Sequence, residues 1–410
     1  MNTFVFLIQN ARFLGFGLAC TLASNFGQTF FIALFGAHIR TDFGLSHSDF
    51  GGLYGFATLV SAAVILWAGR QIDRVDLRLY AGFVFAGLAV SSALMAIAYS
   101  PWVLGVAFFG LRLFGQGLLR HTAVVSMARY FDAARGRAMS VVGLGFPVAE
   151  AAFPLILVVI LNAVTWRAAW GGFALYILAL HLPLALWLLK GHGVRHAALE
   201  QRLKAEDDVE APLTQRRLLT DWRFQMIVPA SLMGPFMLTG LFFHQLALAE
   251  AKGWDIALLA ASFPAFAAAS VLASLITGWV VDRHGPGVVL AVFMVPLTLA
   301  LIVVATLDQA WAVPVYLALG GLTVGASGVL ISAAWAETFG VRHLGAIRSL
   351  TSAMAVVSTA LAPVWVGWLL DAQVQLSSIA YGGAGLAFIT NMLVLAPAHE
   401  LRRKKTKMAV

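Results

Sequence analysis

The chain has 410 residues, of which 60% are hydrophobic and only 11% are charged. A soluble domain carries about 25% charged residues, so this composition excludes one large soluble globule. Apolar runs long enough to cross a bilayer recur along the whole chain, which indicates a membrane protein. The single cysteine, Cys20, excludes an internal disulfide and any metal site built on a pair of cysteines.

The apolar runs predict twelve transmembrane helices, separated by short loops and by one long polar stretch. We therefore expect an all-α membrane protein. Its parts are an N-terminal six-helix half at 1–189, a cytoplasmic linker at 190–223, and a C-terminal six-helix half with a basic cytoplasmic tail at 224–410. The predicted helices lie near 12–36, 49–69, 78–99, 101–127, 138–161, 168–189, 224–248, 256–279, 287–307, 310–335, 346–370 and 377–397.

The positive charge is distributed unequally between the two predicted sides of the membrane. With both termini in the cytoplasm, 22 of the 27 Lys and Arg residues fall on the cytoplasmic side. Only Arg40, Arg167 and Lys252 fall on the other side, and two more arginines lie within a span. Such a bias sets the orientation of membrane proteins. The net charge of +8 is thus explained by topology, and we expect no nucleic-acid partner.

An internal repeat marks the ends of two apolar segments that lie 209 residues apart. In each copy a glycine is followed, after three residues, by an Asp-Arg pair, and in the first copy a further arginine, Arg78, follows. A glycine lets two helices approach closely, and the carboxylate can sit at the start of the next helix or accept hydrogen bonds from arginines. The repeated residues are Gly69, Asp73 and Arg74, and Gly278, Asp282 and Arg283.

This repeat resembles the loop between the second and third helices of each half in the major facilitator superfamily (MFS) of transporters. The resemblance implies an MFS fold of two pseudo-symmetric six-helix halves with a solute site near mid-bilayer. It also implies that the repeated residues, together with Arg78, form a cytoplasmic gate. We therefore expect a monomeric transporter in a bacterial inner membrane that works by alternating access and binds a small molecule or ion. The alternative for the gate residues is a basic turn with no switching role.

Energy for transport is expected from a gradient, and we expect neither an enzyme nor a cofactor. The sequence contains no GxxxxGK[ST] phosphate-binding loop. No nucleophile–base pair or metal triad stands out either.

Charged and polar residues inside the predicted helices are candidates for function, because each costs several kcal/mol to insert. In the fourth helix Arg112, Gln116 and Arg120 are spaced by four and share one face. Glu150, in the fifth helix, is the only carboxylate deep in the membrane. It is either a proton carrier switched by Arg112 or half of a static Arg112–Glu150 pair. Asn25 and Gln28, in the first helix, are expected to line the solute cavity.

The seventh helix suggests copper as one substrate. Met233 and Met237 place two thioethers on one helical face, with His244 seven residues on, and soft sulfur ligands suit Cu(I). This segment resembles the CcoA-like copper importers, a branch of the same superfamily. That branch also carries an HxxxM motif in the eighth helix, and this motif occurs nowhere in the present chain.

The other candidate substrate is a small organic solute, either an anion or an aromatic compound. Arg112 would contact the negative charge, and phenylalanines of the first and seventh helices would form apolar walls. The basic turns also resemble those of the monocarboxylate and oxalate branch of the superfamily. Both substrates remain open at this point. The residues expected to bind solute are Asn25, Gln28, Arg112, Gln116, Met233, Met237 and His244, with Met233 and Met237 as metal ligands for copper.

Overall fold

The computed structural model describes the chain except for residues 1–2, 132–134, 194–217, 341–343 and 409–410. Every regular element in the described residues is helical. Twelve of the helical stretches are long and apolar enough to cross a membrane, which confirms the twelve predicted spans. The largest difference is at the N-terminus, where the first span starts at Val5 rather than at residue 12. Most of the predicted linker, 190–223, lies outside the described residues.

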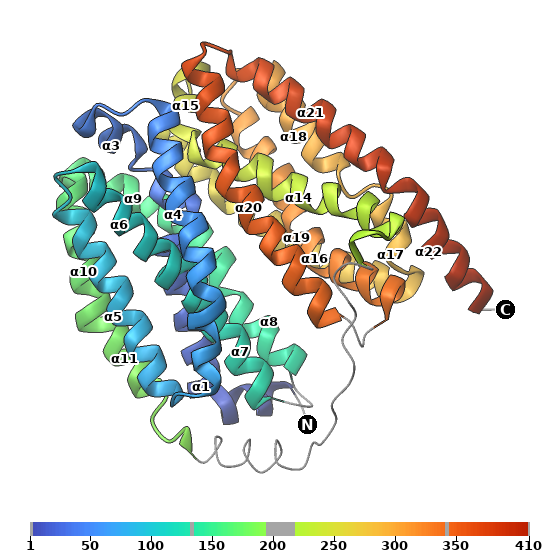
Figure 1. Ribbon diagram of the computed structural model, residues 1–410, viewed down its shortest axis with the longest axis horizontal. Coiled ribbons are helices and arrows are strands. Elements are labelled where there is room, and N and C mark those ends of the chain that lie inside the picture. The colour runs from blue at the N-terminus through green and yellow to red at the C-terminus, as the bar shows by residue number, and fades with distance from the viewer. Residues whose placement is uncertain (1–2, 132–134, 194–217, 341–343, 409–410) are drawn as a thin grey trace. The chain divides into compact units, whose positions relative to one another are not determined.

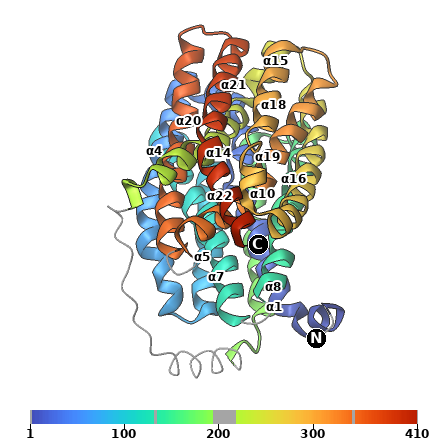
Figure 2. The ribbon, with the colours of Figure 1, turned by 90° about the vertical axis from the view of Figure 1, so that its right-hand side faces the viewer.

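The chain divides into two compact units. The first contains Met1–Phe43 and Phe56–Glu210, and the second contains Gly44–Gly55 and Ala211–Val410. Within each unit the long helices run alongside one another (Figures 1 and 2).

The helices of the first unit include two that change pitch inside the span. Segments η3 and η4 are π-helical turns, and η1 and η2 are 3-10 turns. In Figure 1 α5, α10 and α11 lie together on one side of the unit. The bounds are α1 Thr3–Ser24, η1 Asn25–Gly27, α2 Thr29–Ala33, α3 Gly36–Phe43, α4 His47–Ala68 (whose first turns belong to the second unit), η2 Gly69–Asp73, α5 Leu77–Ala96, α6 Pro101–Gly110, η3 Leu111–Leu119, α7 Arg120–Tyr130, α8 Arg135–Gly143, α9 Gly145–Ala163, α10 Trp166–Tyr176, η4 Ile177–His181 and α11 Leu182–Leu188.

The second unit has longer uninterrupted helices. Their packing pairs α16 with α19, α18 with α21, and α14 with α20. The bounds are α14 Trp222–Phe243, α15 Gln245–Lys252, α16 Ile256–His284, α17 Pro286–Leu290, α18 Val295–Thr306, α19 Ala312–Phe339, α20 Leu344–Asp371, α21 Leu376–Leu393 and α22 Leu395–Met408.

Close contact between α16 and α19 depends on glycines of α19. Gly321 and Gly325 are spaced by four, and a Cβ on either would clash with the backbone of α16, at Phe266 and Ser270 respectively. Apolar burial does not drive helices together in a lipid environment, so close backbone approach and van der Waals contact must do so. The Gly-xxx-Gly spacing of α19 supplies that approach.

The first turns of α4 are anchored within the second unit. The carboxylate of Asp371, at the end of α20, accepts hydrogen bonds from the backbone N–H groups of His47 (3.1 Å) and Ser48 (2.8 Å). It thereby satisfies donors that a helix start leaves open. Gly51 faces the carbonyl of Pro363 so closely that a Cβ would lie 2.6 Å from its oxygen.

An ion pair ties together the ends of three helices in the first unit. The carboxylate of Asp42 accepts hydrogen bonds from the indole N–H of Trp166 (2.8 Å) and from the guanidinium of Arg167. Arg167 also donates to the carbonyl of Ala98 (2.9 Å). The bonds from Trp166 and then Arg167 hold the pKa of Asp42 below its ordinary value of 3.8.

This contact predicts a pH-dependent contribution to stability. Because the folded-state pKa of Asp42 is lowered, its contribution is present above pH 4 to 5 and is lost as pH falls through the folded pKa. Asp42→Asn should lower the thermal midpoint of the purified protein at pH 7, and the difference from wild type should shrink toward pH 3. The side chain is 37% exposed, so screening limits the effect to about 1 kcal/mol. The matched control is Glu250→Gln, and a pH-independent difference for Asp42→Asn would contradict the prediction.

Candidate functional site

The first transmembrane segment is broken in its middle. Helix α1 ends at Ser24, Asn25–Gly27 form a 3-10 turn, and Gln28 is extended, with φ −79° and ψ 149°, before α2 begins. Such a break leaves backbone carbonyls without helical partners, and in an apolar setting each needs another donor. The sequence prediction of one continuous helix over 12–36 missed this break.

Arg112 supplies a donor at the break. Its Nη1 donates to the carbonyl oxygen of Gly27 at 3.0 Å, and only 2% of the residue is exposed. The predicted role of Arg112 was contact with an anionic solute. In the structure its guanidinium stabilises the broken first span from inside the unit, and the solute contact stays a prediction. Asn25, also predicted to line the cavity, is fully buried and donates to the carbonyl of Thr21 (2.9 Å).

The break in the first span packs against the π-helical turn of the fourth span. A Cβ on Gly27 would lie 2.6 Å from the backbone nitrogen of Gln116, and a Cβ on Gly115 would lie 2.9 Å from Cα of Gly27. Short π segments inside α-helices are frequent at functional sites. Here segment η3 carries Arg112 and Gln116, two of the predicted site residues.

Three polar side chains of the first unit are partly exposed within the predicted spans. Gln28, Gln116 and Glu150 are neither buried nor fully exposed. None of their side chains makes a hydrogen bond or ion pair in the described part of the chain. A polar group at this depth is strongly disfavoured against lipid. Each of these side chains is therefore better suited to contact with water or solute than with lipid.

Arg120 contacts the helix that carries Glu150. Arg120 is exposed, and its guanidinium lies over the ring of Phe146, 5.1 Å from the centroid. Phe146 is one turn before Glu150 on α9. Arg112 donates to Gly27 in this structure, and the Arg112–Glu150 pair stays a prediction.

An aromatic cluster fills the interior next to the break. Phe26 contacts Phe153 (5.2 Å between centroids) and Phe173 (5.3 Å), and Phe31 contacts Trp170 (5.8 Å). Both Phe26 and Phe31 are buried. Both rings belong to the core of the unit. Phe31, one of the first-helix phenylalanines expected to form an apolar wall of the solute site, is thus a core residue.

The loop after α4 is held by residues that the sequence prediction did not identify. The ring of His121 contacts the carbonyl of Gly69 (3.1 Å), and Arg129 donates to the carbonyl of Ile72 (3.0 Å). A Cβ on Gly69 would lie 3.3 Å from the His121 ring, so this glycine does permit a close approach. Nothing in the local sequence shows that α7 supplies both partners.

Asp76 caps the following helix. Its carboxylate accepts hydrogen bonds from the backbone N–H groups of Arg78 (2.8 Å) and Leu79 (3.3 Å) and contacts the ring of His192 (3.0 Å). Burial tends to raise the pKa of Asp76, but these hydrogen bonds and His192 hold it below its ordinary value. The side chain of Asp73 lies outside what the structure describes, and Arg74 is exposed.

The second copy of the repeat lies at a helix end. Helix α16 runs through Asp282 and Arg283 to His284 and stops at Gly285, whose φ of 83° favours glycine. Arg283 lies over the ring of Trp279. Gly278 has nothing within 4 Å of an added Cβ. The expectation that Gly278 permits close helix packing is therefore wrong.

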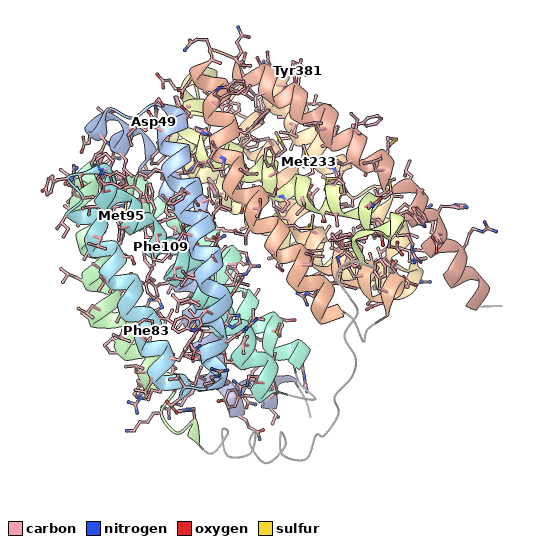
Figure 3. All side chains as sticks on the ribbon, viewed as in Figure 1. Asp49, Phe83, Met95, Phe109, Met233 and Tyr381 are labelled. Atoms are coloured by element: carbon pink, nitrogen blue, oxygen red, sulfur yellow. The ribbon has the colours of Figure 1, made fainter. Side chains whose placement is uncertain are left out.

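The predicted copper ligands lie on α14 and just after its end. Met233, labelled on α14 in Figure 3, and Met237 are both buried. Met237 packs against Gly383 of α21, where a Cβ would lie 3.1 Å from the sulfur. His244 follows the end of α14, so the helical spacing used to align it with the methionines fails there. Its Nε2 lies 3.0 Å from the carbonyl of Pro363. The described residues hold no group of three or more His, Cys, Asp or Glu suited to a metal.

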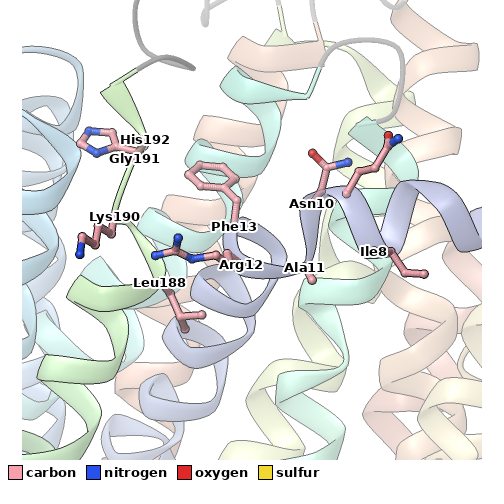
Figure 4. A pocket seen from close by; sticks show the side chains of 10 residues that line it. Ile8, Asn10, Ala11, Arg12, Phe13, Leu188, Lys190, Gly191 and His192 are labelled. Atoms are coloured by element: carbon pink, nitrogen blue, oxygen red, sulfur yellow. The ribbon is translucent and has the colours of Figure 1, made fainter.

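Figure 4 shows a second feature of the first unit, a basic pocket beside the start of α1. The guanidinium of Arg12 reaches toward the segment that carries Lys190 and His192, and Arg12 lies 4.9 Å over the ring of Trp187. An arginine beside an exposed tryptophan is typical of the membrane interface. The pocket therefore marks a membrane-interface end of this unit.

Comparison with known proteins identifies the class. The family model of the Major Facilitator Superfamily matches residues 17–304 and 236–409, so the chain belongs to this superfamily of membrane transporters. It is similar to the gentisate transporter of Corynebacterium glutamicum, with 26% identity over 382 residues, covering 90% of this chain and 82% of that one.

Two solved structures share the fold. They are the inward-facing unoccupied and occupied forms of a bacterial homologue of the human lysosomal transporter Spinster, with TM-scores of 0.60 and 0.61. Each is 14% identical in sequence, and the match covers 95% of this chain and 96% of the other. The chain is thus a multi-pass membrane transporter rather than an enzyme, as predicted.

The crossing at the break of the first span generates a prediction. Gly27→Val should reduce the yield of folded protein and lower its thermal midpoint, because overpacking of a tight contact costs about 1–3 kcal/mol. The matched control is Gly172→Ala in α10, where an added Cβ meets nothing within 4 Å. Equal thermal midpoints for Gly27→Val and wild type in detergent would show that the crossing is not tight.

Proposed function

We propose that the protein is a gradient-driven transporter that moves a small organic anion by alternating access, with protons as the coupling ion. The observation that carries the proposal is the placement of Glu150 and Arg120. Both lie inside membrane-spanning stretches of a transporter, and the guanidinium of Arg120 lies over the ring of Phe146, one turn before Glu150. An ionisable residue inside the membrane is expensive and is therefore expected to work in transport.

Glu150 would carry the proton. A carboxyl group in a poorly solvated site favours its neutral form, and a neighbouring cation favours its charged form. A movement of Arg120 relative to Glu150 would therefore load or release a proton during the transport cycle. Gln28 and Gln116 supply uncharged hydrogen-bonding groups on the same unit, as suits a solute-facing surface.

An aromatic carboxylate is the substrate class with most support. Gentisate is a benzoate with two ring hydroxyls, and the similar C. glutamicum protein is named for its transport. The proposed setting is a bacterial inner membrane with both termini in the cytoplasm, as the distribution of Lys and Arg indicates.

We infer that the loop between α4 and α5 acts in the gate. Gly69, Asp73, Arg74 and Arg78 would take part with the His121 and Arg129 contacts described above, and Asp282 and Arg283 would act at the corresponding helix end. Breaking and re-forming these contacts would accompany the change between states.

Uptake into proteoliposomes tests the proton role. Glu150→Gln should abolish accumulation of labelled gentisate driven by an imposed pH gradient. It should leave exchange of internal for external gentisate, because exchange needs no net proton movement. Glu250→Gln, an exposed carboxylate outside the spans, is the matched control.

Two results would count against this proposal. Gradient-driven accumulation by Glu150→Gln at the wild-type level would remove the proton role. Copper uptake that requires both Met233 and Met237, without gentisate uptake, would replace the organic substrate with the copper alternative.

A further inference from the structure

A cavity of about 200 Å³ opens within the second unit, between α14, α19 and α20. None of its residues belongs to the sites predicted from the sequence. The wall carries one charged side chain, one indole and five hydroxyls, and the remaining positions are small or aliphatic. The lining residues are Ser231, Leu232, Ser327, Gly328, Ile331, Ser332, Trp335, Arg348, Thr351, Ser352 and Ala355.

Arg348 is the only charged residue that lines this cavity among the described residues. It stands near the start of α20 and is exposed, and its side chain makes no hydrogen bond or ion pair in the described part of the chain. No carboxylate lines the cavity to neutralise it. A guanidinium carries five donors in a planar fork that matches a carboxylate. The cavity therefore has an anion-binding group in place.

Trp335 adds a second observation that points to a ligand. The residue is fully buried, between Phe224 (5.3 Å between ring centroids) and Phe339 (5.9 Å), yet its indole nitrogen has no hydrogen-bond partner in the described residues. A buried donor without an acceptor costs about 1–3 kcal/mol. A ligand oxygen that reached this nitrogen would remove that cost.

The hydroxyls supply both kinds of hydrogen-bonding group. Ser231 donates to the carbonyl of Val228 (2.7 Å), and Ser332 donates to that of Gly328 (2.9 Å), which leaves their oxygens as acceptors. The side-chain hydroxyls of Ser327 and Ser352 make no hydrogen bond among the described residues, so these O–H groups can donate to a ligand. Such a wall suits a ligand that has hydroxyls as well as a negative charge.

We propose that this cavity is the subsite that binds the carboxylate end of a small hydroxylated organic acid, with Arg348 as the charge partner. The indole N–H of Trp335 and the serine hydroxyls bind the remaining oxygens, and Leu232, Ile331 and Ala355 contact the apolar body. As the binding site of the transported solute, this subsite rests on the proposed function above. In this proposal the residue that contacts the anion is Arg348 of the second unit. It is not Arg112, which is buried at the break of the first span.

The test is binding by the purified full-length protein in detergent, measured by calorimetry. The probes are gentisate, benzoate and benzamide, the last being the uncharged analogue of benzoate. Wild type should bind both acids and bind benzamide at least tenfold more weakly. Arg348→Gln should weaken both acids at least tenfold, and Arg348→Lys should restore part of the loss. Trp335→Phe keeps the ring, removes the N–H, and should weaken gentisate severalfold.

Matched controls separate a binding loss from a folding loss. Arg403→Gln removes an exposed cation of α22 outside the cavity and should bind as wild type does. The thermal midpoint of each variant is measured without ligand. Loss of binding by Arg348→Gln at a wild-type midpoint supports the subsite. Unchanged binding of both acids by Arg348→Gln, or no preference of wild type for benzoate over benzamide, overturns it.

The proposed function and this subsite fail in different ways. Gentisate uptake that Arg348→Gln leaves intact would overturn the subsite and leave the transport function standing. Binding that depends on Arg348, without gradient-driven uptake of either acid, would support the subsite and overturn the proton-coupled transport.

Discussion

The hydrogen bond from Arg112 to the carbonyl of Gly27 is the contact on which the first unit depends. A membrane span can be broken only where other groups replace the lost helical bonds. The break at Asn25–Gly27 and the π-helical turn at Leu111–Leu119 meet at this point, with two glycines between them. The crossing sets where α2 and α7 begin. It thereby positions Gln28, Gln116 and Arg120.

This arrangement separates an enclosed charge, Arg112, from charges that are accessible. Arg112 is enclosed, and its guanidinium serves the backbone of the first span. Arg120 and Glu150 lie toward an accessible face, where a change of distance between them would alter the proton affinity of the carboxyl group. In the second unit Arg348 has no ion-pair partner among the described residues. Arg112 thus stabilises the fold, Arg120 is proposed to act on the proton, and Arg348 is proposed to bind the solute.

The spans could be predicted because length and apolar composition alone fix them. The repeat at Asp73 and Asp282 was visible because it is a local pattern. Residue roles were harder, since they depend on contacts between distant segments. Nothing near Arg112 in the sequence indicates that Gly27 is its partner. Identifying Asp76 as the helix cap required knowledge of where α5 begins. The cavity around Arg348 was missed because three helices contribute to it.

Arg112 belongs to the fold and Arg120 is proposed to act on the proton, and the pH profile of gentisate uptake tests this division directly. The measurement compares Arg112→Lys and Arg120→Gln with wild type in proteoliposomes at matched protein levels. Loss of the cation beside Glu150 favours the neutral carboxyl. Arg120→Gln should therefore move the pH of half-maximal uptake upward. Arg112→Lys should lower the thermal midpoint and leave the pH profile of the folded protein unchanged. A shifted profile for Arg112→Lys, with a wild-type profile for Arg120→Gln, would contradict the account.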